Sequence, residues 1–435
     1  MTLLGPEFGF LEVEPHAPED RRPDREVILL LHGTGGNKFE WSFPAWRGLN
    51  YDHQHDPSNK HSDGHVSPPW NLLPRFSLSD KRDIRCWRSV LLALGHTIIY
   101  YSQDGADDAI EVARDQLEDR IVPFIRDEVL TGPLAGKRVV IIGHSRGGIL
   151  TRLYLARHTA EASQWIQRVI TLNSPHGATD APNAARRLRD EIQALALLLG
   201  LSLGAPLSVN LLVGLVIRFG IDVEPTAAQA QLVPGDPLFD QLSLPADTPD
   251  IAFHTFGGSS VTVARVYVWY WTPGSFVPRW SIPNPVPHWD WTLFPTEIAP
   301  VSPMLDAIPD IAVFAEQRQG EGDIAVTVAS AQLPGVPHQT LPINHGEAFF
   351  DEPLFAEVTS ILGTPLGAIA AEECRMGWVG NTRTLELHDL GNETRNCQMD
   401  EIIDRWPFER PQDAFDAGYD GCAYCMPEEH HPEEP

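Results

Sequence analysis

The chain has 435 residues, of which 43% are hydrophobic and 21% are charged, and its formal net charge is -27. This composition is typical of a soluble globular protein and excludes a largely disordered one. The length predicts one large domain with insertions plus a smaller unit. Because the acidic excess repels phosphate backbones and anionic headgroups, we expect no nucleic-acid partner.

The amino-terminal stretch and the cysteine pattern bear on the compartment. The first residues, MTLLGPEFGFLEVEPHAPED, place acids and prolines where a Sec signal peptide needs a basic start and an apolar core. Cys86 stands alone, and the other four cysteines lie in the last stretch, which is not the spacing of a disulfide-stapled secreted domain. We therefore expect a reducing, cytoplasmic location, with export by a non-Sec route as the alternative.

Apolar runs alternate with helical periodicity along the first part of the chain. Buried strands are predicted at 26–31, 97–101, 138–142 and 169–172, with a short last strand at 338–343. Helical spacing predicts a crossover helix over 107–130 and a second helix through Tyr154 and Arg157. Strands that alternate with helices predict an α/β fold with a mostly parallel sheet, right-handed crossovers and helices on both faces.

Residues 50–80 interrupt this alternation with a polar, proline-rich stretch that contains DHQHDPSNKHSDGH. We interpret it as an inserted, solvated loop. A divalent metal site is the alternative, but no pair of its histidines has the spacing of a known zinc motif. Those histidines are His53, His55, His61 and His65.

A long apolar segment follows the strand at 169–172. Residues 192–217 contain no charge and are long enough to span a bilayer. A single span would place Ser145 and the residues after 217 on opposite sides of a membrane, so two short helices broken near Pro206 are the better interpretation. We predict an apolar lid or cap over 180–225, with buried core as the alternative.

The motif GHSRGG at 143–148 follows a buried strand and precedes a helix, which is the context that a nucleophilic serine requires. Gly143 and Gly147 supply the small residues that the strand-to-helix turn needs on either side of Ser145. The backbone N–H of Arg146 is placed to stabilise an oxyanion, and the HGTGG loop supplies a second donor, the N–H of Thr34.

A serine nucleophile needs a base and an acid, which in this arrangement follow it in the order acid, then histidine. Asp323 lies in a loop, and His345 lies just after the last predicted strand, so we assign them as acid and base. The weaker bases are His288 and His338, and the fallback acids are Asp306 and Asp310.

These motifs together resemble the alpha/beta-hydrolase superfamily, in particular its lipase-like branch of triacylglycerol lipases and PGAP1-like hydrolases. The resemblance is carried by HGTGG, GHSRGG, LNSPHGATD, the GD-x-x-V loop and INHGEAFFDEPLF, and it covers roughly residues 25–362. It implies Ser145 as nucleophile, Asp323 as acid, His345 as base, and Thr34 and Arg146 as oxyanion donors. His176 in the PHG motif is expected to anchor its loop and takes no catalytic role.

The carboxy-terminal part changes character beyond residue 370. His388, Cys397, Cys422 and Cys425 can form a tetrahedral zinc site, and the ending AGYDGCAYC loosely resembles small zinc modules of the Ada type. Free thiols or a redox pair are the alternatives. We therefore predict a hydrolase domain over 1–370, a small Cys/His module with structural zinc over 371–427 and a disordered acidic tail over 428–435.

The expected function is cleavage of carboxylic esters by an acyl-enzyme mechanism, with no cofactor needed for catalysis. The uncharged lid favours acyl-chain or lipid-like substrates and peripheral lipid contact through the lid. A phospholipase or acyltransferase that acts as an effector or defence protein is one alternative. A catalytically inactive binding protein on a hydrolase fold is another.

Overall fold

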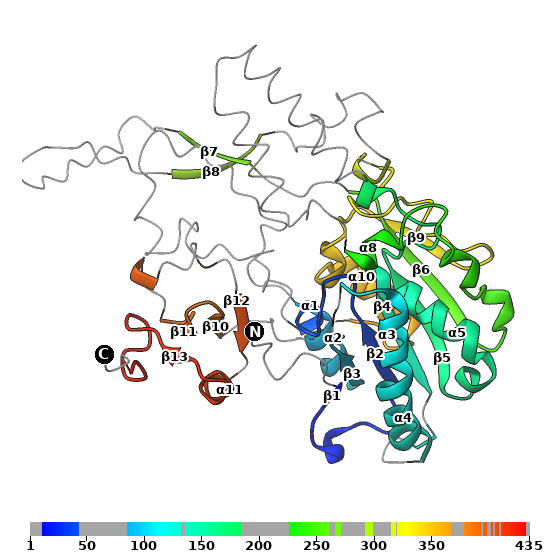
Figure 1. The fold of residues 1–435 in the computed structure, drawn as a ribbon, viewed down its shortest axis with the longest axis horizontal. Helices are drawn as coiled ribbons and strands as arrows, with labels where there is room; N and C mark the ends of the chain where they lie inside the picture. The colour runs from blue at the N-terminus through cyan, green and yellow to red at the C-terminus, as the bar shows by residue number, and fades with distance from the viewer. Residues whose placement is uncertain are drawn as a thin grey trace, which may run out of the picture. The chain divides into compact units, whose positions relative to one another are not determined.

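The computed structural model describes residues 11–42, 85–183, 226–260, 266–270, 292–298, 315–367 and 377–431, apart from short gaps at 104, 106, 132–134, 137, 319, 393–394, 398–401, 403–404 and 409. These residues divide into two compact units. The first contains 11–42, 85–183, 226–260 and 315–367, and the second contains the remaining described residues (Figure 1). The predicted boundaries at 370 and 427 stay predictions.

The first unit is built on a seven-stranded sheet with the order β1-β3-β2-β4-β5-β6-β9. All neighbouring strands are parallel except β1, which pairs antiparallel with β3 at one edge. The strands are β1 (Leu11–Glu14), β2 (Val27–Leu31), β3 (Thr97–Tyr101), β4 (Val139–His144), β5 (Ile166–Leu172), β6 (Ala252–Gly258) and β9 (His338–Leu341). The predicted mostly parallel α/β fold is thereby confirmed.

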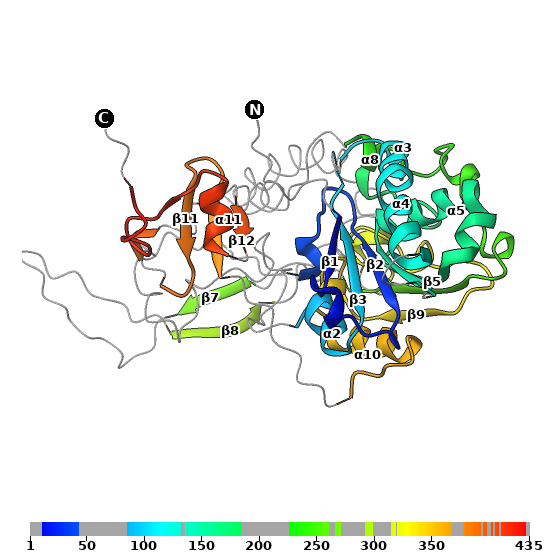
Figure 2. The same cartoon turned by 90° about the horizontal axis from the view of Figure 1, so that it is seen from below.

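The central strands β2, β3 and β4 are buried along their whole length, as strands covered on both faces must be. Figure 2 shows α3, α4 and α5 on one face of the sheet and α2 and α10 on the other. The helices are α1 (Phe39–Ser42), α2 (Trp87–Ala93), α3 (Ile110–Gln116), α4 (Val122–Ile125), α5 (Arg146–Trp165), α8 (Ala227–Ala230) and α10 (Glu352–Ile361). Side chains of alternating strand positions therefore fill two separate cores.

The segment predicted as one helix over 107–130 is helical from Ile110 onward, but it changes its hydrogen-bond pattern three times. π-helical stretches at Leu117–Ile121 and Arg126–Thr131 flank α4. Pro123 lies at the start of α4 and has no N–H to donate, which interrupts the regular ladder. The apolar residues that recur at helical spacing in the segment 107–130, including Leu117, Ile121 and Ile125, are buried as the periodicity predicts.

The second unit contains a four-stranded sheet with the order β12-β10-β11-β13. Its strands are β10 (Trp378–Asn381), β11 (Glu386–Asp389), β12 (Arg405–Phe408) and β13 (Asp420–Gly421), and its helix is α11 (Pro411–Asp416). Strands β7 (Val266–Tyr270) and β8 (Thr292–Ile298) pair antiparallel in a separate two-stranded sheet. Residues 428–431, predicted to be disordered, are instead tied to β13. Gly421 N–H donates to the Glu429 carbonyl oxygen at 3.1 Å.

Several predictions from the sequence concern residues outside the described ones. These are the insert at 50–80, residues 184–225 of the predicted lid, and the weaker candidates His288, Asp306 and Asp310. Within the described part of the chain, no helix combines the length and apolar character needed to cross a membrane.

Cys86, at the start of α2, is disulfide-bonded, whereas the other three described cysteines are free thiols. The cytoplasmic location stays a prediction.

Candidate active site

Ser145 occupies a sharp turn between the buried strand β4 and the helix α5. Its φ of 51° and ψ of -121° lie outside the regions that L-residues prefer, so the turn is strained. The Ser145 N–H donates to the Leu172 carbonyl oxygen of β5 at 2.8 Å, which fixes the turn to the sheet. Such strain holds a serine side chain at the carboxyl end of the strands, where a substrate can reach it.

Two glycines are required because this turn packs tightly. A Cβ at Gly143 would lie 2.8 Å from the Gly147 carbonyl carbon, and a Cβ at Gly147 would lie 2.3 Å from the Leu31 carbonyl oxygen. The neighbouring atoms are backbone and cannot rotate away. The G-x-S-x-G pattern is therefore a steric requirement of this site.

The HGTGG loop lies directly against the nucleophile. A Cβ at Gly33 would be 3.5 Å from Ser145 Oγ, and Gly35 adopts a positive φ of 62°. His32 fastens the loop: its Nε2 accepts from the Gln103 N–H at 3.0 Å, so its Nδ1 carries the proton and donates to the Gly33 carbonyl oxygen at 2.8 Å. Thr34 follows in this loop and is half-buried.

The predicted acid and base are hydrogen-bonded to each other. His345 Nδ1 donates to Asp323 Oδ2 at 2.9 Å. Asp323 is fully buried, and its Oδ1 accepts from the Ala325 N–H at 3.0 Å and the Val326 N–H at 2.7 Å. With Nδ1 committed to the carboxylate, Nε2 is the ring atom of His345 that is left to accept a proton.

His144 connects the nucleophile turn to the base and was not anticipated from the sequence. Its Nε2 donates to the His345 carbonyl oxygen at 3.0 Å, and the two ring centroids are 4.7 Å apart. Burial, and then the neighbouring His345, hold the pKa of His144 well below its usual range, so this ring stays neutral. Since His144 directly precedes Ser145, one hydrogen bond ties the base to the nucleophile.

In the part of the chain that the structure describes, no hydrogen bond joins Ser145 Oγ to His345. Catalytic hydrogen bonds in unliganded enzymes are often long and tighten only when substrate binds. In the described structure, Ser145 is connected to His345 through His144, which directly precedes Ser145 and hydrogen-bonds to the His345 carbonyl oxygen.

Arg146 is the first residue of α5, where backbone N–H groups have no carbonyl partner within the helix. Its N–H therefore suits the predicted oxyanion role. Its side chain is fully buried and donates to Gln103 Oε1 at 3.0 Å and to the Asp108 carbonyl oxygen at 2.7 Å. Burial lowers the pKa of the guanidinium to about 10, which leaves it charged near neutrality.

Two other candidate histidines have structural partners. His338 lies on β9 with its Nδ1 2.8 Å from Thr255 Oγ1, and His176 has its Nε2 2.9 Å from Thr171 Oγ1. Burial, and then the nearby Arg152, lower the pKa of His176 well below its usual range. The anchoring role expected for His176 fits these contacts.

The second unit brings the four predicted metal ligands together. The ligand atoms of His388, Cys397, Cys422 and Cys425 all lie within 4.8 Å of one another, and all four residues are buried. The Cys422 and Cys397 sulfurs are 4.0 Å apart, and Cys425 Sγ is 3.9 Å from His388 Nδ1. This cluster is a candidate metal centre.

Comparison with known proteins gives one family match. Residues 113–192, which include the nucleophile turn, match the PGAP1-like alpha/beta domain. No curated protein matches the chain.

Several solved structures resemble the chain at low identity. A lipase of Bacillus licheniformis in its mature form is 16% identical, with 82% of this chain and 98% of that chain covered and a TM-score of 0.43. A phospholipase of Legionella pneumophila is 12% identical, with 54% and 39% covered and a TM-score of 0.30. A carboxylesterase of the thaumarchaeon Nitrososphaera gargenis is 16% identical, with 58% and 77% covered and a TM-score of 0.30.

The sheet order, the strained serine turn after β4 and the family match over 113–192 lead to one conclusion. Residues 113–192 of the chain are similar to the PGAP1-like alpha/beta domain, and the described ones lie in a mostly parallel α/β sheet that carries a strained serine turn.

Proposed function

We propose that this protein is a serine hydrolase of carboxylic esters, with Ser145, His345 and Asp323 as its catalytic residues. The observation that carries the proposal is the hydrogen bond of 2.9 Å between His345 Nδ1 and the buried carboxylate of Asp323. It lies beside a serine on a strained turn, and His144 links the two. A base oriented by a buried carboxylate is the arrangement that activates a serine hydroxyl.

The reaction has two acyl-transfer steps. His345 Nε2 takes the proton of Ser145 Oγ while this oxygen bonds to the ester carbonyl carbon, and the N–H groups of Thr34 and Arg146 stabilise the resulting oxyanion. The carbon–oxygen bond to the alcohol then breaks, and His345 returns the proton to the departing oxygen. Water repeats the sequence on the acyl-enzyme and releases the acid and free Ser145.

An acyl-chain substrate is the finer part of this proposal. It is supported by the uncharged sequence of 192–217, because an apolar segment of this length is suited to cover apolar material. We expect kcat/KM for p-nitrophenyl esters to rise about 200-fold from butyrate to octanoate, since four more buried methylenes contribute about 0.8 kcal/mol each and about 1.4 kcal/mol is a factor of ten. A series from acetate to palmitate measures this. A series that falls with chain length contradicts the lipid-like substrate and leaves a short-chain esterase.

The carboxy-terminal cluster supports a second proposal, a structural zinc site held by His388, Cys397, Cys422 and Cys425. In a tetrahedral site with bonds of about 2.3 Å, sulfur ligands are roughly 3.8 Å apart, and the Cys422–Cys397 separation of 4.0 Å fits this value. His388 offers Nδ1 to the cluster, while its Nε2 is 3.7 Å from a Glu386 carboxylate oxygen. A zinc-bound histidine usually donates its outer ring N–H to a carboxylate, a backbone carbonyl or water, and at 3.7 Å the Glu386 carboxylate lies near Nε2 without a hydrogen bond to it.

Removing one ligand should empty this site. We expect about one zinc per chain in the native protein, and less than about a tenth of that in Cys397→Ser, because three remaining ligands leave the tetrahedron open. Elemental analysis of the purified full chain measures both. Tyr424→Phe is the control, since this side chain lies between Cys422 and Cys425 yet is 55% exposed. Absence of zinc from the native protein, or equal zinc in Cys397→Ser, would show that the cluster holds free thiols.

A further inference from the structure

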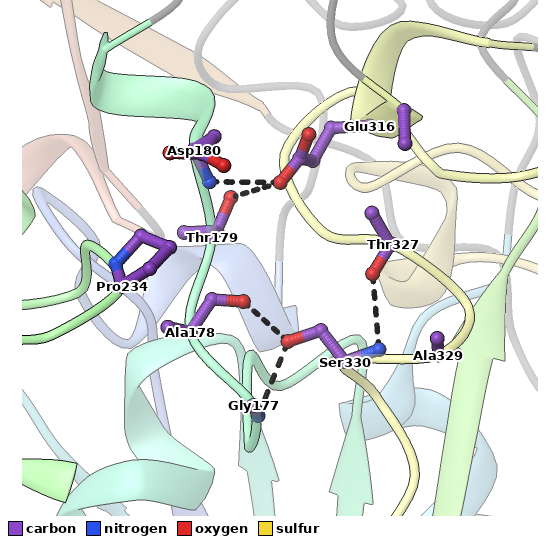
Figure 3. A pocket seen from close by; sticks show the side chains of 10 residues that line it. Gly177, Ala178, Thr179, Asp180, Pro234, Glu316, Thr327, Ala329 and Ser330 are labelled. Atoms are coloured by element: carbon purple, nitrogen blue, oxygen red, sulfur yellow. Dashed lines mark hydrogen bonds between the residues drawn. The ribbon is translucent and has the colours of Figure 1, made fainter.

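A pocket of about 370 Å³ lies beside the loop that carries Asp323 (Figure 3). One wall is the segment 177–180, which follows β5, and another is formed by residues of 315–330; Pro234 also lines the pocket. Small-ligand sites in proteins typically have volumes of roughly 300–1,000 Å³. The pocket is large enough for the head group of a substrate.

The chemistry of the pocket is set by Glu316, which is only 4% exposed. One carboxylate oxygen, Oε1, accepts from the Asp180 N–H at 2.8 Å and lies 3.2 Å from the Thr179 hydroxyl oxygen. Figure 3 shows the second oxygen turned away from these two groups. The carboxylate is therefore held through Oε1, and Oε2 takes no part in these contacts.

No positively charged side chain balances this carboxylate within the described residues. Among the described residues that line the pocket, two are acids, Glu316 and Asp180, and none is a lysine, arginine or histidine. The Asp180 carboxylate is also engaged, since it accepts from Asn183 Nδ2 at 3.2 Å. A buried carboxylate without a cationic partner is costly, so this pocket favours a ligand that brings positive charge and N–H donors.

The kind of cation follows from the rest of the lining. None of the lining residues that the structure describes is aromatic, and aromatic faces are what proteins use to hold quaternary ammonium groups. A primary ammonium instead donates charge-assisted hydrogen bonds to a carboxylate. Glu316 Oε2 and the Thr327 hydroxyl are both acceptors for such a group.

The pocket and the catalytic acid share one loop. The Ile324 N–H, directly after Asp323, donates to the Glu316 carbonyl oxygen at 2.8 Å. The Thr179 hydroxyl also donates to the carbonyl oxygen of Ala325, whose N–H binds Asp323 Oδ1. A group bound at Glu316 is therefore one loop away from the acid that orients His345.

We propose that this pocket is a substrate subsite in which Glu316 binds a primary ammonium group of the ester. The inference rests on the proposed ester hydrolase function and adds a charged determinant of specificity to it. Glu316 is a binding residue and takes no part in the acyl transfer.

The first test measures binding without catalysis. In calorimetric titrations we expect n-butylammonium to bind native protein and Ser145→Ala about tenfold more tightly than neutral n-butanol, and Glu316→Gln to lose this difference. Glutamine keeps an oxygen for Asp180 and Thr179 but presents an amide N–H to the pocket. Glu321→Gln, which removes an exposed carboxylate from the same loop, should bind like the native protein.

The second test places the ammonium on an ester. We expect kcat/KM for 6-aminohexyl butyrate to exceed that for heptyl butyrate about tenfold in the native protein and to equal it in Glu316→Gln. Equal values for the two esters in native protein, or an unchanged ratio in Glu316→Gln, would overturn the subsite. If neither ester is hydrolysed while butylammonium binds through Glu316, the proposed function fails and the binding site stands.

Discussion

Replacing Asp323 by Asn should lower kcat by about 10⁴-fold while the fold is retained, as expected for a carboxylate that orients a catalytic histidine. The reason lies in how the carboxylate is held. Asp323 Oδ1 accepts two backbone N–H groups, so the single oxygen of an asparagine should stay at that position. Its amide nitrogen then faces His345 Nδ1 and donates to it, which forces the ring proton onto Nε2. That tautomer cannot accept the proton of Ser145.

Ester hydrolysis and thermal unfolding, measured on the same samples, check this prediction. Asp236→Asn is a suitable control, because its Oδ1 accepts the Leu238 N–H at 2.8 Å in a loop that contains no catalytic candidate. We expect this control to keep native activity. A loss of less than about tenfold in Asp323→Asn would show that Asp323 is not the acid of the site.

Replacing Ser145 by Ala should lower kcat by about 10⁶-fold, because removal of the nucleophile leaves only the oxyanion donors and substrate binding. The fold should be unaffected. Alanine carries the same Cβ as serine and meets the same strain at a φ of 51°, and no described hydrogen bond of the fold uses the Ser145 hydroxyl. Ser163→Ala, at a half-buried position in the last turn of the same helix, is the matched control. Residual activity above about a thousandth would contradict the role of Ser145 as nucleophile.

Much of the fold could be predicted from hydrophobic patterning alone. Strands β2, β3 and β4 are unbroken apolar runs, which indicate parallel strands buried on both faces. Strand β6, Ala252–Gly258, escaped prediction because AFHTFGG ends in two glycines and has no continuous apolar pattern. The edge strand β1, with the sequence LEVE, forms because it pairs antiparallel with β3, about ninety residues away in the sequence. A local sequence pattern does not encode such a pairing.

The candidate site could be predicted where chemistry imposes a fixed order of residue types. The order of serine, acid and histidine indicated Asp323 and His345, and the structure joins them by a hydrogen bond. The roles of His144 and Glu316 depend on tertiary contacts. Glu316, for example, binds the Asp180 N–H across 136 residues of sequence. No local motif marks such a contact, so only the assembled fold reveals it.

The carboxy-terminal cluster shows the same distinction. Cysteine and histidine are so selective as ligands that four residues spread over 388–425 indicated a common site, and the fold brings them together. The lid over 180–225 depends on how an apolar segment packs, and apolar composition alone does not separate a cap from a core. It therefore stays a prediction.

The most direct test of the proposed mechanism is reaction of the native protein with an alkyl fluorophosphonate, followed by intact-mass analysis and peptide mapping. Such a reagent forms a stable bond only with a serine whose proton a neighbouring base removes. We expect one adduct per chain on Ser145, absent from Ser145→Ala and strongly slowed in Asp323→Asn. Native protein that remains unmodified, or an adduct on another residue, would contradict the assignment of Ser145 as an activated nucleophile.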